Sequence, residues 1–199
     1  MIIHIYVEGG SAGVQKSYCR RAFKSFIGQA IPEATFTVTA CGDRRRTFEA
    51  FKLALANHPN DYVILLVDSE ESVTKDAWVH LAERPGDGWE KPTGARNDQA
   101  HLMVQVMESW FLADPESLEQ YFGNGFLRTA LPRRDILEEI QKREVYASLD
   151  KAAKKTKKLS YHKTRDGFAI LARISPLLVR QSFTHAENLL STLERMATS

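Results

Sequence analysis

An unbroken apolar run, Tyr62-Val63-Ile64-Leu65-Leu66-Val67, constrains the fold of this chain more than any other feature. A run of this length and composition favours a β-strand, and its lack of polar alternation indicates that both faces are covered. Strands of that kind occupy the centre of parallel sheets, where helices pack on each side. The rest of the chain is therefore expected to supply neighbouring strands and two layers of helices.

Three other segments have strand-like patterns and are separated by segments with helical spacing; they lie at residues 2–7, 36–40 and 102–107. The resulting order of strands and helices predicts an α/β fold with a mostly parallel four-stranded sheet flanked by helices. Helices are expected to begin near Asp43, which fits an N-cap, and to span about residues 74–83. The connection at residues 85–98 contains three glycines and two prolines, which is typical of a functional or mobile loop.

The pattern is helical throughout beyond Phe122. We expect residues 1–122 to form the α/β domain and residues 123–199 to form a helical C-terminal extension packed on it as one compact unit. No apolar run approaches the length of a membrane span, and the start lacks the features of a signal peptide. The two cysteines, Cys19 and Cys41, have no zinc-like spacing, which indicates a cytoplasmic protein with reduced thiols.

Acidic side chains follow three of the four predicted strands; they are Glu8 after the first, Asp68 and Glu70 after the third, and Glu108 after the fourth. Because the carboxyl ends of parallel strands meet at one edge of a sheet, these side chains are expected to lie together. Crowded carboxylates repel one another unless a cation lies among them, and hard oxygen ligands suit Mg²⁺ or Mn²⁺. The sequence therefore predicts a divalent-metal site with these four carboxylates as candidate ligands.

The local sequence around these residues supports one shared ion. Asp68 and Glu70 face the same way if the segment is extended, because side chains alternate along a strand. Glu8 can supply a third oxygen or accept a proton from water. Glycines at positions 9, 10 and 13 would let the backbone approach a phosphate closely.

The chain resembles the Toprim fold of topoisomerases, primases and OLD-type nucleases through Val7-Glu8-Gly9 after the first strand and Val67-Asp68-Ser69-Glu70 after the third. It also resembles DUF4276, a Toprim-like bacterial family of unassigned function, through Met107-Glu108-Ser109-Trp110-Phe111-Leu112-Ala113-Asp114. The Toprim likeness covers about residues 1–118, and the later helices match only the smaller family. The resemblance implies a Toprim-like nuclease or an inactive relative, with an ATPase partner encoded in mobile or phage-defence loci.

The resemblance also implies roles for individual residues. Glu8 matches the Toprim glutamate that acts as general acid/base or metal ligand, and Asp68 matches the first metal-binding aspartate. Glu70 stands where the family usually has a second aspartate, and its extra methylene is expected to shift the metal. Glu71 and Ser72 are further candidates. No tyrosine matches the topoisomerase nucleophile, so strand passage is not expected.

Basic residues are concentrated between Lys142 and Arg165, where nine lysines or arginines accompany two acids. This segment favours a polyanionic partner, because lysines on phosphates bind nucleic acid without reading its sequence. A solvated helical face is the alternative. Lys163 is a candidate for stabilising the transition-state phosphate, with a plain surface lysine as the alternative. The candidate nucleic-acid-binding residues are Lys151, Lys154, Lys155, Lys157 and Lys158.

Single residues outside these groups give weaker signals. Arg44, Arg45 and Arg46 lie at the predicted start of a helix, where cations oppose the helix dipole, and this points to a polyanion or an acidic partner. His101 and His162 are interpreted as ordinary polar residues.

Two other functions remain open. The segment Gly10-Ser11-Ala12-Gly13-Val14-Gln15-Lys16-Ser17 approaches the P-loop of nucleotide-binding proteins, but Gln15 stands where that loop needs glycine. A catalytically inactive regulatory or scaffold subunit would instead use the basic segment and a docking patch at Trp110 and Phe111, although such a pair is more commonly buried against the sheet. The expected function is a Mg²⁺- or Mn²⁺-dependent nuclease on DNA or RNA. Its expected catalytic residues are Glu8, Asp68, Glu70 and Lys163.

Overall fold

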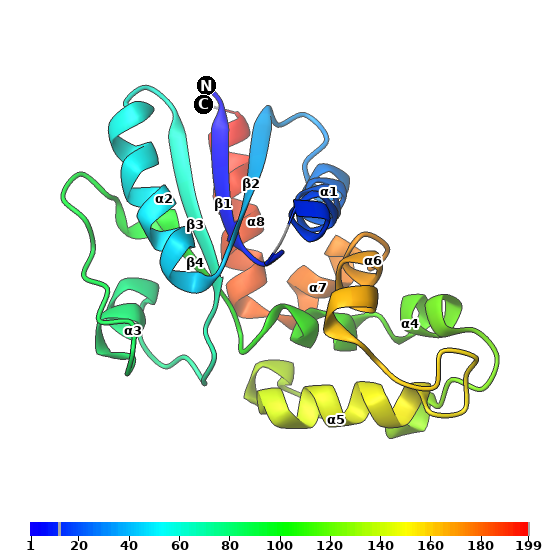
Figure 1. Ribbon diagram of the computed structural model, residues 1–199. Helices are drawn as coiled ribbons and strands as arrows, with labels where there is room; N and C mark the ends of the chain where they lie inside the picture. Colours follow the sequence, from blue (N-terminus) through cyan, green and yellow to red (C-terminus); the bar gives the residue numbers. More distant parts are fainter. Residues whose placement is uncertain (12, 199) are drawn as a thin grey trace.

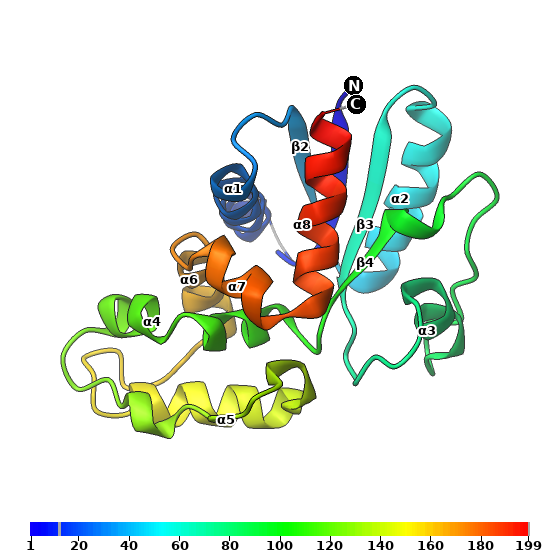
Figure 2. The same cartoon turned by 180° about the vertical axis from the view of Figure 1, so that it is seen from behind.

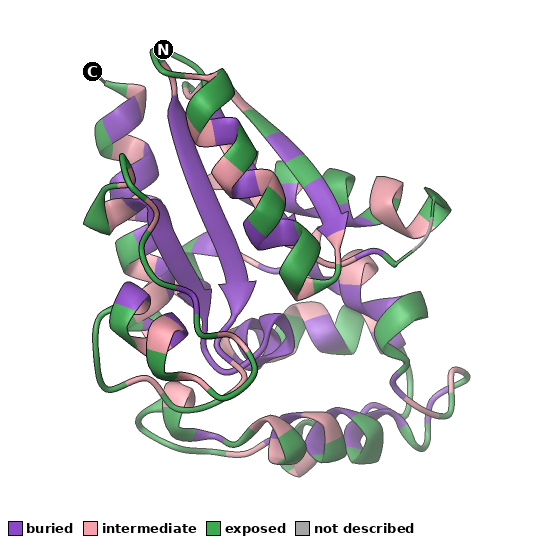
Figure 3. Cartoon of the chain, turned by 60° about the vertical axis from the view of Figure 1, so that its left-hand side comes forward, coloured by how far each residue is buried: buried purple, intermediate pink, exposed green. Residues whose placement is uncertain are grey.

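The computed structural model describes residues 1–11 and 13–198 and confirms the α/β fold (Figure 1). One four-stranded sheet has the order β2-β1-β3-β4, and every neighbouring pair is parallel. The strands are β1 (Ile3–Glu8), β2 (Phe36–Gly42), β3 (Tyr62–Asp68) and β4 (Ala100–Met103). As the apolar run predicts, β3 is central and buried along its whole length (Figure 3).

Helices cover both faces of the sheet (Figures 1 and 2). On one face, α1 (Gly13–Ala30) and α8 (Thr184–Ala197) share a core with Ile64 and Leu66 of β3. On the other face, α2 (Arg44–Asn57) and α3 (Ala77–Glu83) pack on residues that alternate with these, among them Leu65. Alternate residues of β3 therefore belong to different cores, because successive side chains of a strand point to opposite faces.

The connection between α3 and β4 is packed against α2. Trp89 is buried and stacks on Phe48, with ring centroids 4.5 Å apart. The short 3₁₀ helix η1 (Asn97–Gln99) then leads into β4. The long loop is thus held in place by an aromatic pair and contributes to the buried layer.

Two predicted boundaries are wrong. The sequence predicts a strand at residues 102–107, but β4 ends at Met103 and the 3₁₀ helix η2 (Met107–Ala113) follows. The apolar pattern continues past Met103 because residues 104 and 106 are also buried, although the backbone has left the strand. The helix predicted from about residue 74 begins at Ala77, because Asp76 is its N-cap and accepts the Val79 N–H at 3.1 Å.

The C-terminal part of the chain is helical, as predicted. Its elements are α4 (Pro115–Phe122), η3 (Arg128–Ala130), η4 (Leu137–Glu139), α5 (Lys142–Ala153), the π-helical turn η5 (Lys163–Gly167), α6 (Phe168–Leu171) and α7 (Pro176–Ser182), followed by α8. Leu149 of α5 and Leu189 of α8 lie in the same hydrophobic core as Ile5 of β1. Within residues 1–11 and 13–198, no helix combines the length and apolar character that a membrane crossing requires.

Candidate metal centre

Three carboxylates meet at the carboxyl edge of the sheet. Glu8 is the last residue of β1, Asp68 is the last residue of β3, and Glu70 follows two positions later. One carboxylate oxygen of each lies within 4.8 Å of the other two. Ligands that bind one ion at ~2.0–2.6 Å must lie close to one another, so small side-chain movements would let all three share a divalent cation.

The turn after β3 brings Glu70 to this group. Glu70 has a φ of 67°, in the left-handed region, so the expectation of an extended Asp68-x-Glu70 segment is wrong. The turn is held by backbone hydrogen bonds, in which Ser69 N–H donates to the Met103 carbonyl at 2.9 Å and Glu70 N–H donates to the Gln105 carbonyl at 2.8 Å. The two carboxylates therefore converge because the neighbouring chain fixes a turn, and not because of strand alternation.

Asp68 is buried among other acidic groups. Its Oδ1 accepts the Met107 N–H at 2.8 Å. Burial is the main cause that raises the pKa of Asp68 well above its ordinary value, and the negative charges of Glu8 and Glu108 add to it. Burial also raises the pKa of Glu8, with Arg44 and Lys163 opposing the shift and Glu70 adding to it. Burial thus disfavours the ionised forms of both carboxylates, and a cation placed among them would favour those forms.

Arg44 is a site residue whose role the sequence does not reveal. Its Nη1 donates to Glu8 Oε2 at 3.2 Å and to the backbone carbonyl of Asp68. Asp87 fixes the guanidinium from the other side, accepting from Nη2 at 2.6 Å, and Arg84 contacts Asp87 at 3.0 Å. The cation at the start of α2 is tolerated because these carboxylates surround it.

Glu108 is a fourth carboxylate near this group but is not one of the three whose oxygens all lie within 4.8 Å of one another. It is fully buried and accepts hydrogen bonds from the hydroxyls of Tyr161 at 2.9 Å and Tyr146 at 3.2 Å. Lys163 Nζ lies 3.9 Å from both Glu108 Oε1 and Asp68 Oδ2. Burial opposes the charged ammonium, but Glu108 and Asp68 outweigh it and raise the pKa of Lys163. Glu108 thus contacts Lys163 and two tyrosine hydroxyls, and its role as a metal ligand stays a prediction.

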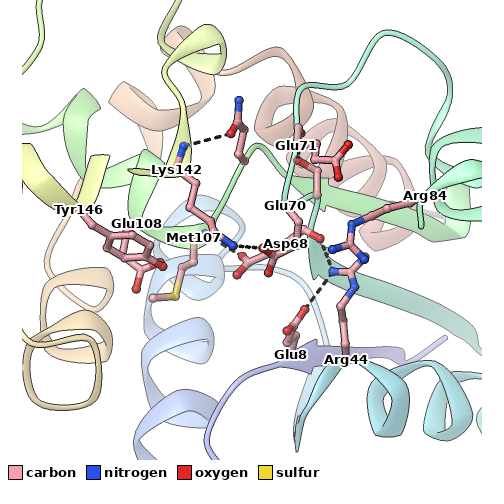
Figure 4. Close-up of polar contacts among 12 residues, drawn as sticks. Glu8, Arg44, Asp68, Glu70, Glu71, Arg84, Met107, Glu108, Lys142 and Tyr146 are labelled. Carbon is pink, nitrogen blue, oxygen red and sulfur yellow. Dashed lines mark hydrogen bonds and ion pairs between the residues drawn. The ribbon is translucent and has the colours of Figure 1, made fainter. Parts of the chain in front are cut away.

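Lys142, the first residue of α5, reaches Glu70 (Figure 4). Its ammonium donates to Glu70 Oε2, and its backbone N–H donates to Gln105 Oε1 at 3.0 Å. The Gln105 amide in turn donates to the Ser72 hydroxyl at 3.1 Å. Ser72 therefore supports the turn, and Glu71 is exposed beside it.

A cavity of about 270 Å³ opens beside Glu8 and Asp68, and Lys163 and Phe168 line it as well. The glycine loop after β1 forms another wall. Gly10 has a φ of 73°, and a Cβ there would lie 2.7 Å from the Lys16 Cα, so only glycine fits. The loop thus brings backbone close to the carboxylates, whereas Gly13 begins α1; the approach of this backbone to a phosphate stays a prediction.

The P-loop-like segment lies beside the same cavity. Gln15 lines it and accepts a hydrogen bond from the Ser11 hydroxyl at 2.9 Å. Ala12 lies outside the described residues.

The basic residues predicted to bind nucleic acid lie away from the carboxylates. Nine positions separate Lys142 from Lys151 in α5, which corresponds to ~14 Å along the helix axis. Lys151, Lys154, Lys155 and Lys157 are exposed, whereas Lys158 is half-buried with its ammonium 4.4 Å from the Tyr121 ring centroid. We call these five residues the lysine strip. Because α5 lies beyond the carboxyl edge of the sheet (Figure 1), the strip extends outward from the metal centre.

Other residues singled out in the sequence lie outside the site. Trp110 and Phe111 are buried in the core, so the suggested aromatic docking patch is wrong. His101 is buried, and burial lowers its pKa to about 4, so it is an uncharged polar residue that contacts the Asp98 carbonyl. His162 is exposed and contacts the Ser160 hydroxyl.

Comparison with known proteins gives one match. The family described as Domain of unknown function (DUF4276) matches residues 7–194, a span that includes every residue of the metal centre. No curated protein and no solved structure matches the chain.

Proposed function

This chain belongs to the DUF4276 family, and we propose that it is a divalent-metal-dependent phosphodiesterase that hydrolyses nucleic acid. The observation that carries the proposal is the approach of carboxylate oxygens from Glu8, Asp68 and Glu70 to within 4.8 Å of one another. Carboxylates grouped in this way suit Mg²⁺ or Mn²⁺, which also bind phosphate oxygens.

The donor chemistry fits such an ion. All three candidate ligands are oxygens, and the pKa values of Glu8 and Asp68 are raised, first by burial and then by neighbouring carboxylates, which a bound cation would offset. When bound, the ion would polarise a phosphoryl oxygen and lower the pKa of an attacking water.

The protein residues around the ligands have separate tasks. Lys163 points its ammonium toward Asp68 at the cavity and would bind a non-bridging phosphate oxygen as charge develops there. Arg44 orients Glu8, which would bind the ion or accept a proton from water. Lys142 pairs with Glu70 and would be released toward the phosphate backbone when that carboxylate turns to an ion.

The lysine strip supports a polymeric substrate. It begins ~14 Å along α5 from Lys142, a distance that a small phosphoester does not span but about four base pairs of duplex do. The resemblance to Toprim nucleases supports the same class of substrate. The proposed setting is the cytoplasm, with an ATPase partner as a further expectation of that resemblance.

The test is cleavage of labelled DNA and RNA by purified protein across a Mg²⁺ and Mn²⁺ titration, alone and with the product of the neighbouring gene. Metal-dependent cleavage that Asp68→Asn removes would support the proposal. Failure to cleave either nucleic acid in every condition, or equal cleavage by the Asp68→Asn protein, would refute it. ATP hydrolysis that depends on Lys16 would favour the P-loop alternative.

A further inference from the structure

A second group of metal-ligating side chains lies at the amino edge of the same sheet. His4 is the second residue of β1, Asp61 directly precedes β3, and His58 is the C-cap residue of α2. One donor atom of each lies within 4.8 Å of the other two. This group shares no residue with the metal centre at the carboxyl edge.

Hydrogen bonds to their outer atoms hold two of these side chains in place. Asp61 Oδ1 accepts the Ile2 N–H at 2.9 Å, and His4 Nδ1 lies 3.0 Å from the Thr37 hydroxyl. Their inner atoms, Asp61 Oδ2 and His4 Nε2, face each other at 3.1 Å. Histidines that bind metals are commonly oriented in this way, with one ring nitrogen held by a second group and the other directed at the ion.

His58 completes the group from a less restrained position. Its Nδ1 lies 3.9 Å from Asp61 Oδ2, and its side chain is 35% exposed. The ring stacks on that of His4 with centroids 3.9 Å apart. Neutral imidazole is the form that binds a metal. Because His58 lies at a helix end, it has room to turn its nitrogen toward an ion held by the other two.

We propose that His4, His58 and Asp61 bind a Zn²⁺ ion, with water as the fourth ligand. Two imidazoles and one carboxylate suit Zn²⁺ and related transition ions, whereas Mg²⁺ prefers oxygen ligands alone. A cavity of about 410 Å³, lined in part by His58 and Asp61, gives the group access to solvent and space for the water. The ion would connect the start of β1, the end of α2 and the start of β3.

The test uses metal-free full-length protein and three variants. Zn²⁺ and Mg²⁺ are titrated by calorimetry, and Co²⁺ is added in parallel because its visible absorption reports four-coordinate binding. His58→Ala removes the most exposed ligand, and His162→Ala removes an exposed histidine elsewhere as the matched control. Asp68→Asn distinguishes the new site from the carboxylate centre. Thermal unfolding of each metal-free variant checks that it folds.

We expect one equivalent of Zn²⁺ whose affinity falls at least ~10-fold in His58→Ala, as for other changes to metal-site ligation. His162→Ala and Asp68→Asn should keep that equivalent, and excess Mg²⁺ should not displace it. Equal Zn²⁺ affinity in His58→Ala and His162→Ala would overturn the proposal. Loss of the equivalent in Asp68→Asn alone would also overturn it, because the ion would then belong to the carboxylates. Neither result depends on nuclease activity.

Discussion

The two ends of strands β1 and β3 have donor groups of different chemistry. At the carboxyl end the strands finish in Glu8 and Asp68, and all three clustered donors are carboxylate oxygens. At the amino end the cluster has two imidazoles and Asp61. The same pair of parallel strands thus presents donor atoms that suit a hard ion at one edge and donor atoms that suit a borderline ion at the other.

The aspartate at each end reports a different electrostatic state. Burial and neighbouring carboxylates raise the pKa of Asp68. The pKa of Asp61 is lowered by the backbone N–H of Ile2 and then by His4, so its ionised form is already satisfied. The carboxyl edge therefore has a buried carboxyl group with a perturbed pKa, of the kind that marks functional sites, whereas the ionised aspartate at the amino edge is already satisfied by hydrogen bonds.

The largest expected difference between the two ends is in catalysis. Asp68→Asn should lower metal-dependent cleavage by at least about 100-fold, because it removes a ligand charge while keeping the acceptor for the Met107 N–H. The matched change at the other end, Asp61→Asn, should leave the cleavage rate within about twofold, since no reacting group lies there. Initial rates at saturating Mn²⁺ measure both. An equal loss in both variants would remove the distinction between the ends.

The next largest expected effect concerns Lys163, the lysine beside the carboxylates at the carboxyl edge. Lys163→Met should lower kcat roughly 10- to 100-fold, because its charge lies beside Asp68 at the cavity where the proposed substrate phosphate would bind. Glu108→Gln should act in the same direction, since Glu108 holds Lys163. Lys24→Met, in an exposed position of α1, is the control. Calorimetry should show Mn²⁺ still bound by the Lys163→Met protein; lost Mn²⁺ binding would mean that Lys163 maintains the ligands.

A smaller effect concerns how substrate reaches that edge. Changing all five residues of the lysine strip to glutamine should weaken nucleic-acid binding about 10-fold, equally for every sequence. Each lost phosphate contact should flatten the slope of log K against log salt by roughly 0.7–0.9. Fluorescence anisotropy across a salt series measures the slope, and metal binding at either end should not change. An unaltered slope would show the strip to be a solvated surface, and lost affinity for a protein partner alone would favour the scaffold alternative.

The smallest effect is in stability, and its sign should differ between the ends. The pKa of Asp68 is raised in the folded state. Its contribution to the free energy of unfolding is therefore fully present below its pKa in the unfolded chain, about 4, and is lost as the pH rises through its pKa in the folded protein. Asp68→Asn should therefore stabilise metal-free protein at pH 7 by on the order of 1 kcal/mol and much less at pH 4.

Asp61 has the opposite linkage. Its pKa is lowered in the folded state, so its contribution to the free energy of unfolding is present above its pKa in the unfolded chain and is lost as the pH falls through its pKa in the folded protein. Asp61→Asn should therefore destabilise the metal-free protein at pH 7. Urea unfolding in EDTA at both pH values measures the two variants, and a shift of the same sign in both would contradict the electrostatic contrast.

The sheet and the position of its acidic edge could be predicted from local sequence. The apolar run of β3 has few alternatives to a central strand, and Glu8 and Asp68 lie at strand ends whatever the loops do. The basic residues that contact these carboxylates could not be predicted in the same way. Lys142 meets Glu70 across 72 positions of chain, and local periodicity gives no information on such contacts. The sequence gives one indication that Arg44 is unusual, because a cation at the start of a helix opposes the helix dipole. Its hydrogen-bond partner Asp87, however, lies 43 positions away in the chain.

For Glu108, the sequence predicts the place of the side chain but not its contacts. Its position near the end of the fourth strand predicts that it reaches the edge, and it does lie beside Lys163. Its role depends on the hydroxyls of Tyr146 and Tyr161, which come from the helical extension. Glu70 shows the same limit, because a non-glycine residue gives no sequence signal for a left-handed turn.

The entry of Lys142 and Lys163 into the carboxylate centre has a consequence for the chain as the ribosome makes it. Synthesis runs from the amino end, so all three clustered carboxylates emerge within the first 70 residues. The two lysines that face them emerge more than 70 residues later. A nascent chain therefore carries the acidic group before it carries either of these cations, so the three carboxylates must be tolerated without Lys142 and Lys163 while more than 70 further residues are added.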